Sequence, residues 1–137
     1  MTSQHAGRGP LRGLVVDWGG VLTGDVRLGV QAWAEQDGVD LQAYAGVMAD
    51  WLGEPLGAEA RFNPIHALER GEMQVPDFEA SLAAALTART GRAYEPHGLL
   101  DRLFRHFETA HDMTGLVRRA HQARIRTALL SNSWGNH

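Results

Sequence analysis

The pattern of apolar and polar positions marks two short strands that lie far apart in the chain. The uninterrupted apolar run Leu14–Val16 ends in a single acidic residue, Asp17, and two glycines follow almost at once. A short continuous apolar run bounded by glycine is typical of a strand that is buried on both faces, as in a parallel sheet. A second run, TALL at 127–130, ends in the small polar residues Ser131, Asn132 and Ser133. The pattern therefore predicts two strands that each end in polar residues.

Between these runs, apolar residues recur at helical spacing, and glycines and prolines separate the segments. Asp40 precedes a segment with a 3.6-residue period and is placed to cap a helix there. Gly38 and Gly91 follow periodic segments and are placed to end them. In the first helix, Leu28, Ala32 and Trp33 are expected on one side. The pattern predicts helices in 26–38, 41–53, 63–72, 75–91 and 98–111, and a further short helix around 116–120 before the second strand.

Composition narrows the class of protein. The chain has 137 residues, 44% of them hydrophobic, which suits one sizeable core. It contains no cysteine, which excludes disulfides, thiolate zinc sites and thiol nucleophiles within this sequence. No segment approaches the about 18 consecutive apolar residues of a membrane span, and the first residues lack a secretory apolar region. We therefore expect a soluble, cytoplasmic protein.

Charge adds two expectations. The net charge of −3 is small, and acidic and basic residues are interspersed, so neither a nucleic-acid partner nor a membrane surface is indicated. All 13 basic residues are arginine, so a mechanism that needs a lysine must find it outside these residues. The seven histidines show no metal-binding spacing. His66, Arg61 and Arg70 are candidates for contacts with a ligand, although solvent-facing roles are the commoner case for such residues.

The ends of the two predicted strands carry the candidate chemistry. In open α/β sheets, ligands bind beyond the carboxyl ends of parallel strands. If the two strands are neighbours, the Asp17 carboxylate and the Ser131 hydroxyl converge, beside backbone N–H groups of the glycine turn. Such a set suits a phosphorylated ligand, because hydroxyl and amide groups donate to phosphoryl oxygens while a carboxylate attacks phosphorus or holds Mg²⁺. The alternative is that Asp17 is an ordinary turn or cap residue and that SNS is a strand-exit turn.

The motifs themselves resemble a known family. LVVDWGGVLT at 14–23 is similar to the first motif of the haloacid dehalogenase-like (HAD) hydrolases, and TALLSNS at 127–133 is similar to their second motif. The stretch LERGEMQVPDFEASLAAAL at 68–86 resembles a segment of the helical caps of this family. The resemblance extends from about residue 11 to residue 137.

The resemblance implies an α/β fold with a HAD-like Rossmannoid parallel sheet and a helical (C1-type) cap inserted after the first strand. The core would comprise 11–25 and 111–137, the cap 26–110, and a loose leader 1–10. It further implies a phosphatase-type hydrolase, in which an aspartyl phosphate forms on the nucleophile. The implied site consists of the nucleophile and Mg²⁺ ligand Asp17, the backbone carbonyl of Gly19 as a second ligand, and the phosphate-binding residues Gly20, Ser131 and Asn132.

The sequence departs from the family pattern at Gly19. Most phosphatases of the family carry there a second aspartate, which protonates the leaving group. General acid-base catalysis raises the rate by a factor of roughly 10² to 10⁴. Without this aspartate, either the enzyme is restricted to substrates with good leaving groups, or another residue or the substrate itself supplies the proton. The dehalogenase branch usually has a bulkier aromatic residue at the matching position, so that alternative fits less well.

The family's third and fourth motifs, a lysine or arginine and acidic Mg²⁺ ligands, are absent from these residues. We therefore expect the sequence to be the N-terminal part of a longer protein. The expected function of the intact protein is Mg²⁺-dependent hydrolysis of a small phosphorylated metabolite. The alternative is a truncated, non-catalytic module that self-associates into a homo-oligomer through the exposed edge of its sheet. A lysine at a helix start and paired acidic residues after His137 would favour the enzyme.

Overall fold

The computed structural model describes residues 12–53 and 63–131, which form a mixed α/β arrangement that is mostly helical. This agrees with the expected α/β class, and the described ranges contain one pair of strands. The elements, in chain order, are β1 (Gly13–Val16), α1 (Val26–Asp37), α2 (Leu41–Leu52), α3 (Pro64–Glu69), α4 (Val75–Thr90), α5 (Leu99–Phe104), α6 (His111–Gln122) and β2 (Arg126–Leu129).

The two strands are parallel neighbours, which is the condition on which the expected convergence of Asp17 and Ser131 depends. Their register runs from Gly13 opposite Arg126 to Val16 opposite Leu129, and the Leu130 N–H extends the pairing by donating to the Val16 carbonyl at 2.9 Å. Parallel pairing brings the carboxyl ends of both strands, and the polar residues that follow them, to the same edge.

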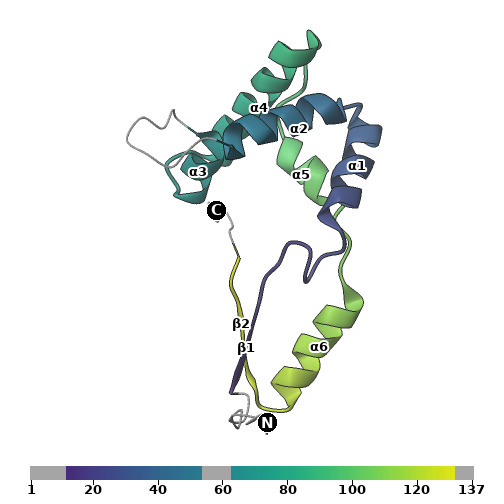
Figure 1. The fold of residues 1–137 in the computed structure, drawn as a ribbon, viewed down its shortest axis with the longest axis vertical. Helices are drawn as coiled ribbons and strands as arrows, with labels where there is room; N and C mark the ends of the chain where they lie inside the picture. Colours follow the sequence, from purple (N-terminus) through teal and green to yellow (C-terminus); the bar gives the residue numbers. More distant parts are fainter. Residues whose placement is uncertain (1–11, 54–62, 132–137) are drawn as a thin grey trace, which may run out of the picture.

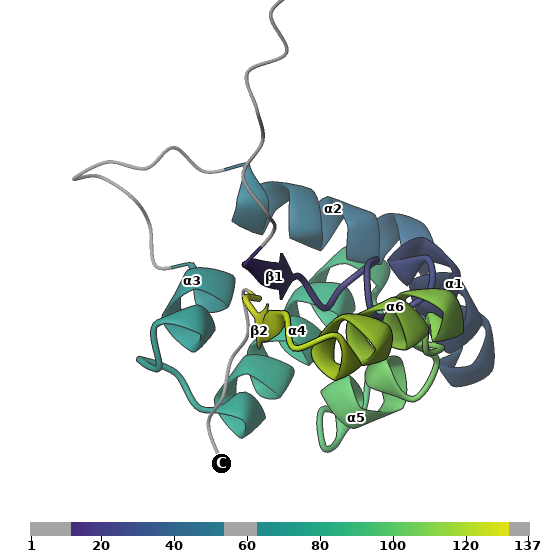
Figure 2. The ribbon, with the colours of Figure 1, turned by 90° about the horizontal axis from the view of Figure 1, so that it is seen from below.

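Burial of β1 on both faces, however, is a prediction that the structure corrects. Val15 is 62% exposed, and burial alternates along the strand. Figure 2 shows helix α6 beside the strand pair, and α6 packs against β2. In the described part of the chain the opposite face has no comparable layer, so alternate strand residues remain open to solvent.

Helices α1 to α5 gather at the other end of the molecule from α6 (Figure 1). Helix α4 packs against α2 and α3, while α1 packs against α5. Their shared core consists of large side chains that are almost wholly buried, namely Trp33, Val47, Leu68, Leu82, Leu86 and Leu99. Among the described helices, none combines the length and the apolar character that crossing a membrane requires.

The helical part, α1 to α5, is joined to the strand part, β1, α6 and β2, by two linkers that lie side by side. The first linker runs between β1 and α1, and the second runs between α5 and α6. The Gly24 N–H donates to the Glu108 carbonyl at 2.8 Å, and the Ala110 N–H donates to the Leu22 carbonyl at 2.9 Å. Between these bonds, Thr23 forms an antiparallel bridge with Thr109. The same pairing explains a correction to the predicted helix 98–111. Helix α5 ends at Phe104, the chain then turns through Arg105 and His106, and 108–110 pair with the first linker instead of continuing the helix.

Gly29, inside α1, lies close to His106 and Phe107, which follow α5. A Cβ at this position would lie 2.3 Å from Cδ1 and 2.7 Å from Cε1 of Phe107, and 3.1 Å from the His106 carbonyl oxygen. Gly→Ala inside a helix ordinarily stabilises by about 1 kcal/mol, but overpacking costs about 1–3 kcal/mol. We expect Gly29→Ala to lower the free energy of unfolding by about 2 kcal/mol, measured by urea denaturation.

Gly115 in α6 provides the matched control. The nearest atom to a Cβ there is Nη1 of Arg119 at 3.4 Å, the end of a flexible side chain. Gly115→Ala should therefore raise the free energy of unfolding by about 0.5–1 kcal/mol. Equal stabilisation by both substitutions would show that Phe107 yields freely and that the close approach does not constrain the fold.

Candidate functional site

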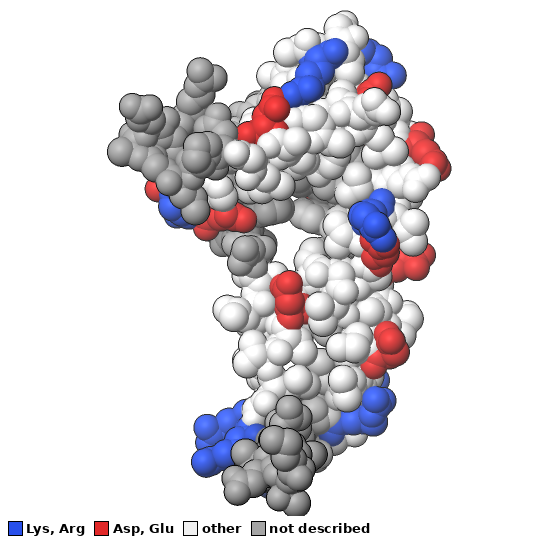
Figure 3. Space-filling model, viewed as in Figure 1, with Lys and Arg blue, Asp and Glu red and all other residues white. Residues whose placement is uncertain are grey.

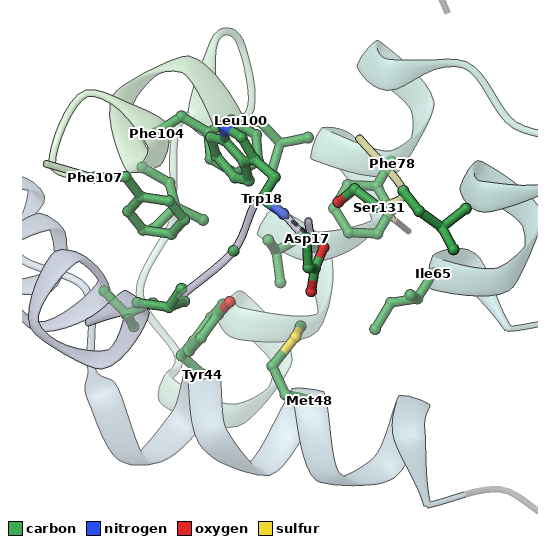
Figure 4. Close-up of a pocket in the computed structure, with 16 residues that line it drawn as sticks. Asp17, Trp18, Tyr44, Met48, Ile65, Phe78, Leu100, Phe104, Phe107 and Ser131 are labelled. Atoms are coloured by element: carbon green, nitrogen blue, oxygen red, sulfur yellow. Dashed lines mark hydrogen bonds between the residues drawn. The ribbon is translucent and has the colours of Figure 1, made fainter. Parts of the chain in front are cut away.

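A cavity of about 550 Å³ lies between the carboxyl ends of the strands and the helices. In the space-filling view, the molecule is hollowed between its helical part and its strand part (Figure 3). Strand-end residues line one side of the cavity, namely Asp17, Trp18, Gly19, Leu130 and Ser131. Helices and the segment after α5 supply the rest, Val26, Val30, Tyr44, Met48, Ile65, Phe78, Leu82, Leu100, Leu103, Phe104 and Phe107. The predicted convergence of Asp17 and Ser131 on one cavity is therefore present (Figure 4).

The Asp17 side chain has one engaged and one open oxygen. Oδ1 accepts a hydrogen bond from the Trp18 backbone N–H at 2.7 Å, whereas no hydrogen bond within the described residues involves Oδ2. The turn behind Asp17 is tightly fixed, because the Trp18 carbonyl accepts from the N–H groups of Val21, Leu22 and Thr23. The backbone thus orients a carboxylate at the strand end and leaves one of its oxygens available to a ligand.

The other predicted site residues differ in whether they line the cavity. Gly19 and Ser131 line the cavity together with Asp17. Gly20 does not line it, and its N–H donates to the Thr23 hydroxyl at 2.8 Å. Since Gly20 has φ +71° in this turn, its amide serves the turn itself and is not open to a phosphate in this conformation. Asn132 lies outside the described residues.

Three aromatic rings form a continuous wall beside Asp17. The centroid of Trp18 lies 5.9 Å from that of Phe104 and 5.9 Å from that of Phe107, and the two phenylalanine rings are 5.4 Å apart. Edge-to-face and tilted contacts at these distances are favourable between aromatic rings. Trp18, adjacent to the candidate nucleophile, thereby connects the strand-end turn to the end of the helical part.

Tyr44 supplies a polar group on the opposite wall, and Figure 4 shows its hydroxyl directed into the cavity. Its ring packs edge-on against Trp33 with centroids 5.3 Å apart. Burial raises the pKa of the Tyr44 hydroxyl above its ordinary value, so it stays protonated and can donate a hydrogen bond at neutral pH. In the sequence, Tyr44 is one of the residues of the periodic segment that follows Asp40. Its role in the cavity could not be recognised because that role depends on how α2 faces the strand ends.

The raised pKa of Tyr44 makes a prediction about stability at high pH. In the unfolded chain this phenol loses its proton at about pH 10, whereas the folded protein retains the proton to higher pH. Folded protein then binds more protons than unfolded protein, so stability falls as the pH rises through this range. We expect the loss of stability between about pH 8 and about pH 11 to be smaller for Tyr44→Phe than for wild type, as measured by urea midpoints. Identical pH dependence would contradict this assignment.

The donors at the strand ends suit a hard cation only in part. The Asp17 carboxylate and the Gly19 backbone carbonyl are oxygen donors, which Mg²⁺ prefers, and Mg²⁺ commonly uses one or two carboxylates together with substrate phosphate and water. Within 12–53 and 63–131, no three histidine, aspartate or glutamate side chains are grouped so as to hold a metal. The described residues can therefore supply one carboxylate to a metal that also binds the substrate.

Two of the charged candidates from the helical part, His66 and Arg70, do not reach the cavity. His66 pairs instead with Glu69, its Nδ1 lying 3.2 Å from Oε2, and Arg70 forms an exposed pair with Glu72 at 2.7 Å. Neither residue lines the cavity, and these local contacts with glutamates explain both side chains. Arg61 lies outside the described residues.

Asp17 is thus the single acidic side chain among the described residues that line the cavity. Comparisons of the chain with protein-family models, with curated proteins and with solved structures find no match.

Proposed function

We propose that the intact protein is a HAD-like hydrolase that cleaves phosphomonoesters through Asp17, with Mg²⁺ as its cofactor. The observation that carries the proposal is the placement of Asp17 and Ser131 on one cavity, at the carboxyl ends of two paired parallel strands. The resemblance of 14–23 and 127–133 to the two family motifs supports the same assignment.

In the first step, the open oxygen of Asp17 attacks phosphorus and forms an aspartyl phosphate. The bond between phosphorus and the ester oxygen breaks, and the leaving group departs with the bonding electrons and takes a proton from water. In the second step, water attacks phosphorus, the bond to Asp17 breaks, and phosphate and the free carboxylate are released. The Ser131 hydroxyl donates a hydrogen bond to a phosphoryl oxygen. Mg²⁺, when bound by Asp17 and the Gly19 carbonyl, supplies positive charge that offsets the phosphoryl oxygens.

Proton donation to the leaving group is the weak point of this site. Gly19 stands where an acid-base aspartate is expected, and the described lining offers only the Tyr44 and Ser131 hydroxyls as proton donors. An ester with a stable leaving group, such as a phenol, is therefore the best first substrate, because its departure depends least on an acid.

The test is phosphate release from phenyl phosphate by the full-length gene product, with Mg²⁺ and with excess chelator. We expect release that depends on the added metal. The absence of metal-dependent release from phenyl phosphate, with the protein shown to be folded by circular dichroism, would contradict the proposal.

A second candidate function, a self-associating module, is favoured by the open strand pair. Val15, Leu129 and Leu130 are 62%, 58% and 73% exposed, and in the described chain each strand has one partner only. Unpaired strand edges pair readily with another copy of the same chain. Sedimentation should then show a dimer that Val15→Glu dissociates, whereas Leu28→Glu, on an equally exposed site in α1, leaves it intact. A monomer at tens of micromolar would contradict this candidate.

A further inference from the structure

The cavity beside Asp17 has one polar end and a large apolar remainder. Polar side chains reach it from the strand ends, as Asp17 and Ser131, and from the opposite wall, as Tyr44. Among the described residues, the rest of the lining is aliphatic, aromatic, methionine or glycine. Its volume of about 550 Å³ falls within the usual range of small-molecule sites, which is about 300–1,000 Å³. The space beyond the reacting group therefore suits an organic body with little polarity.

The walls of this apolar part belong to the protein core. Phe78 and Leu82 are 4% and 1% exposed and stand on α4, the helix that packs against both α2 and α3. Leu100 and Leu103, on α5, are each 5% exposed. Because side chains in a packed core hold one arrangement, the apolar surface is formed before a ligand binds.

The charged side chains of the lining restrict the class of ligand independently of the apolar walls. In the described part of the lining, Asp17 is the one charged side chain, and no arginine contributes. Two arginines of the helical part have other partners, since Arg102 binds Asp37 and the Glu95 carbonyl and Arg89 binds Asp50. A ligand body that carries a second anionic group would therefore find no cationic side chain in the described lining. Each hydroxyl of a sugar that is left there without a hydrogen-bond partner would lower the affinity roughly tenfold or more.

We propose that the ester this site cleaves has an uncharged, apolar organic body, an aryl or alkyl group that fills the cavity between the aromatic wall and α4. This inference rests on the proposed function, because it names the substrate class of the same site. The phosphoryl group lies at Asp17 and Ser131, and the apolar body extends away from the strand ends.

The test compares phenyl phosphates that carry different para substituents, since a para alkyl group hardly alters the acidity of the phenol. Each added methylene should raise kcat/KM about fourfold until the cavity is full. The sharpest pair is 4-propylphenyl phosphate against 4-(2-hydroxyethyl)phenyl phosphate, which differ only by a hydroxyl in place of a methyl group. We expect the propyl ester to be preferred roughly tenfold or more. Equal rates, or a preference for the hydroxyethyl ester, would overturn the inference.

Substitution of Met48 tests whether the preference for the propyl ester arises in this cavity. Met48 lines it and is partly buried, so Met48→Gln brings an amide to the apolar wall with little change in volume. We expect this variant to lose most of the preference, and Met48→Leu to keep it. Met113→Gln on α6, at a partly buried position outside the cavity, is the matched control and should also keep it. Retention of the preference in Met48→Gln would contradict the placement of the apolar body.

Binding of the two corresponding phenols separates this inference from the proposed function. Calorimetry on the wild-type protein should show 4-propylphenol binding roughly tenfold more tightly than 4-(2-hydroxyethyl)phenol, with Met48→Gln reducing the difference. If no ester is hydrolysed and this difference persists, the proposed function fails while the apolar site stands. If esters are hydrolysed and the phenols bind equally, the proposed function stands and the apolar substrate class is wrong.

Discussion

We expect Asp17→Asn to lower kcat/KM for phenyl phosphate by on the order of 10³-fold or more, because the substitution replaces the attacking anion of the proposed mechanism with a neutral amide of nearly the same shape. The amide oxygen can still accept the hydrogen bond that Asp17 Oδ1 accepts from the Trp18 N–H at 2.7 Å. The strand-end turn should therefore be unchanged, and the loss should appear in turnover and not in folding. Initial rates of phosphate release, with thermal midpoints measured alongside, test both parts.

Asp25→Asn is the matched control for this substitution. Asp25 caps α1 through its bond to the Arg27 N–H, and asparagine caps helices about as well as aspartate. Hydrogen bonds from Arg27 lower the pKa of Asp25, so the control removes one negative charge eight residues from Asp17 in an exposed position. Its activity should match wild type. Equal rates for wild type and Asp17→Asn would end the assignment of Asp17 as nucleophile.

We expect Glu79→Ala to lower the free energy of unfolding by about 3 kcal/mol, because this buried carboxylate caps a helix other than its own. Glu79 stands in α4 and is 5% exposed. Its Oε2 accepts from the Gly98 N–H at 3.1 Å, and its Oε1 accepts from the Leu100 N–H at 2.9 Å. Helix α5 begins at Leu99 with no side-chain cap from its own N-cap residue, so alanine leaves the buried Leu100 N–H and the partly buried Gly98 N–H without this partner. Urea denaturation measures the effect.

Two further variants at glutamate positions separate capping from the loss of a charge. Glu79→Gln keeps one oxygen acceptor and should cost about half as much, in the range of about 1–2 kcal/mol. Glu35→Ala in α1 removes an exposed carboxylate whose hydrogen-bond partner is Gln31, and its effect should stay within about 0.5 kcal/mol. If Glu79→Ala costs no more than Glu35→Ala, the two backbone bonds add nothing to the stability of α5.

Local chemistry made several features of the fold predictable from the sequence. Asp40 caps α2 by accepting from the Ala43 N–H at 2.8 Å. Gly38 and Gly91 end α1 and α4 with φ of +64° and +71°, a left-handed conformation that favours glycine. Each of these features is decided within a few residues, so the residue types alone indicate them.

Features set by long-range packing were less predictable. The sequence placed Leu28 on the inner side of α1, yet Leu28 is 65% exposed, while Gly29 and Trp33 are buried. The buried face depends on where α5 and Phe107 lie, and the helical period does not contain that information. The candidate site divides in the same way. Parallel pairing made the convergence of Asp17 and Ser131 predictable, whereas the apolar wall combines side chains from several helices whose arrangement one sequence does not reveal.

The paired linkers restrict how the cavity can widen. Since 22–24 and 108–110 are joined by hydrogen bonds, the helical and strand parts can separate only by bending both linkers together about one shared axis. Trp18 belongs to the strand side of this axis, and Phe104 belongs to the helical side. Any such opening therefore moves the indole away from the phenylalanine ring, so the separation of Trp18 from Phe104 measures how far the cavity is open.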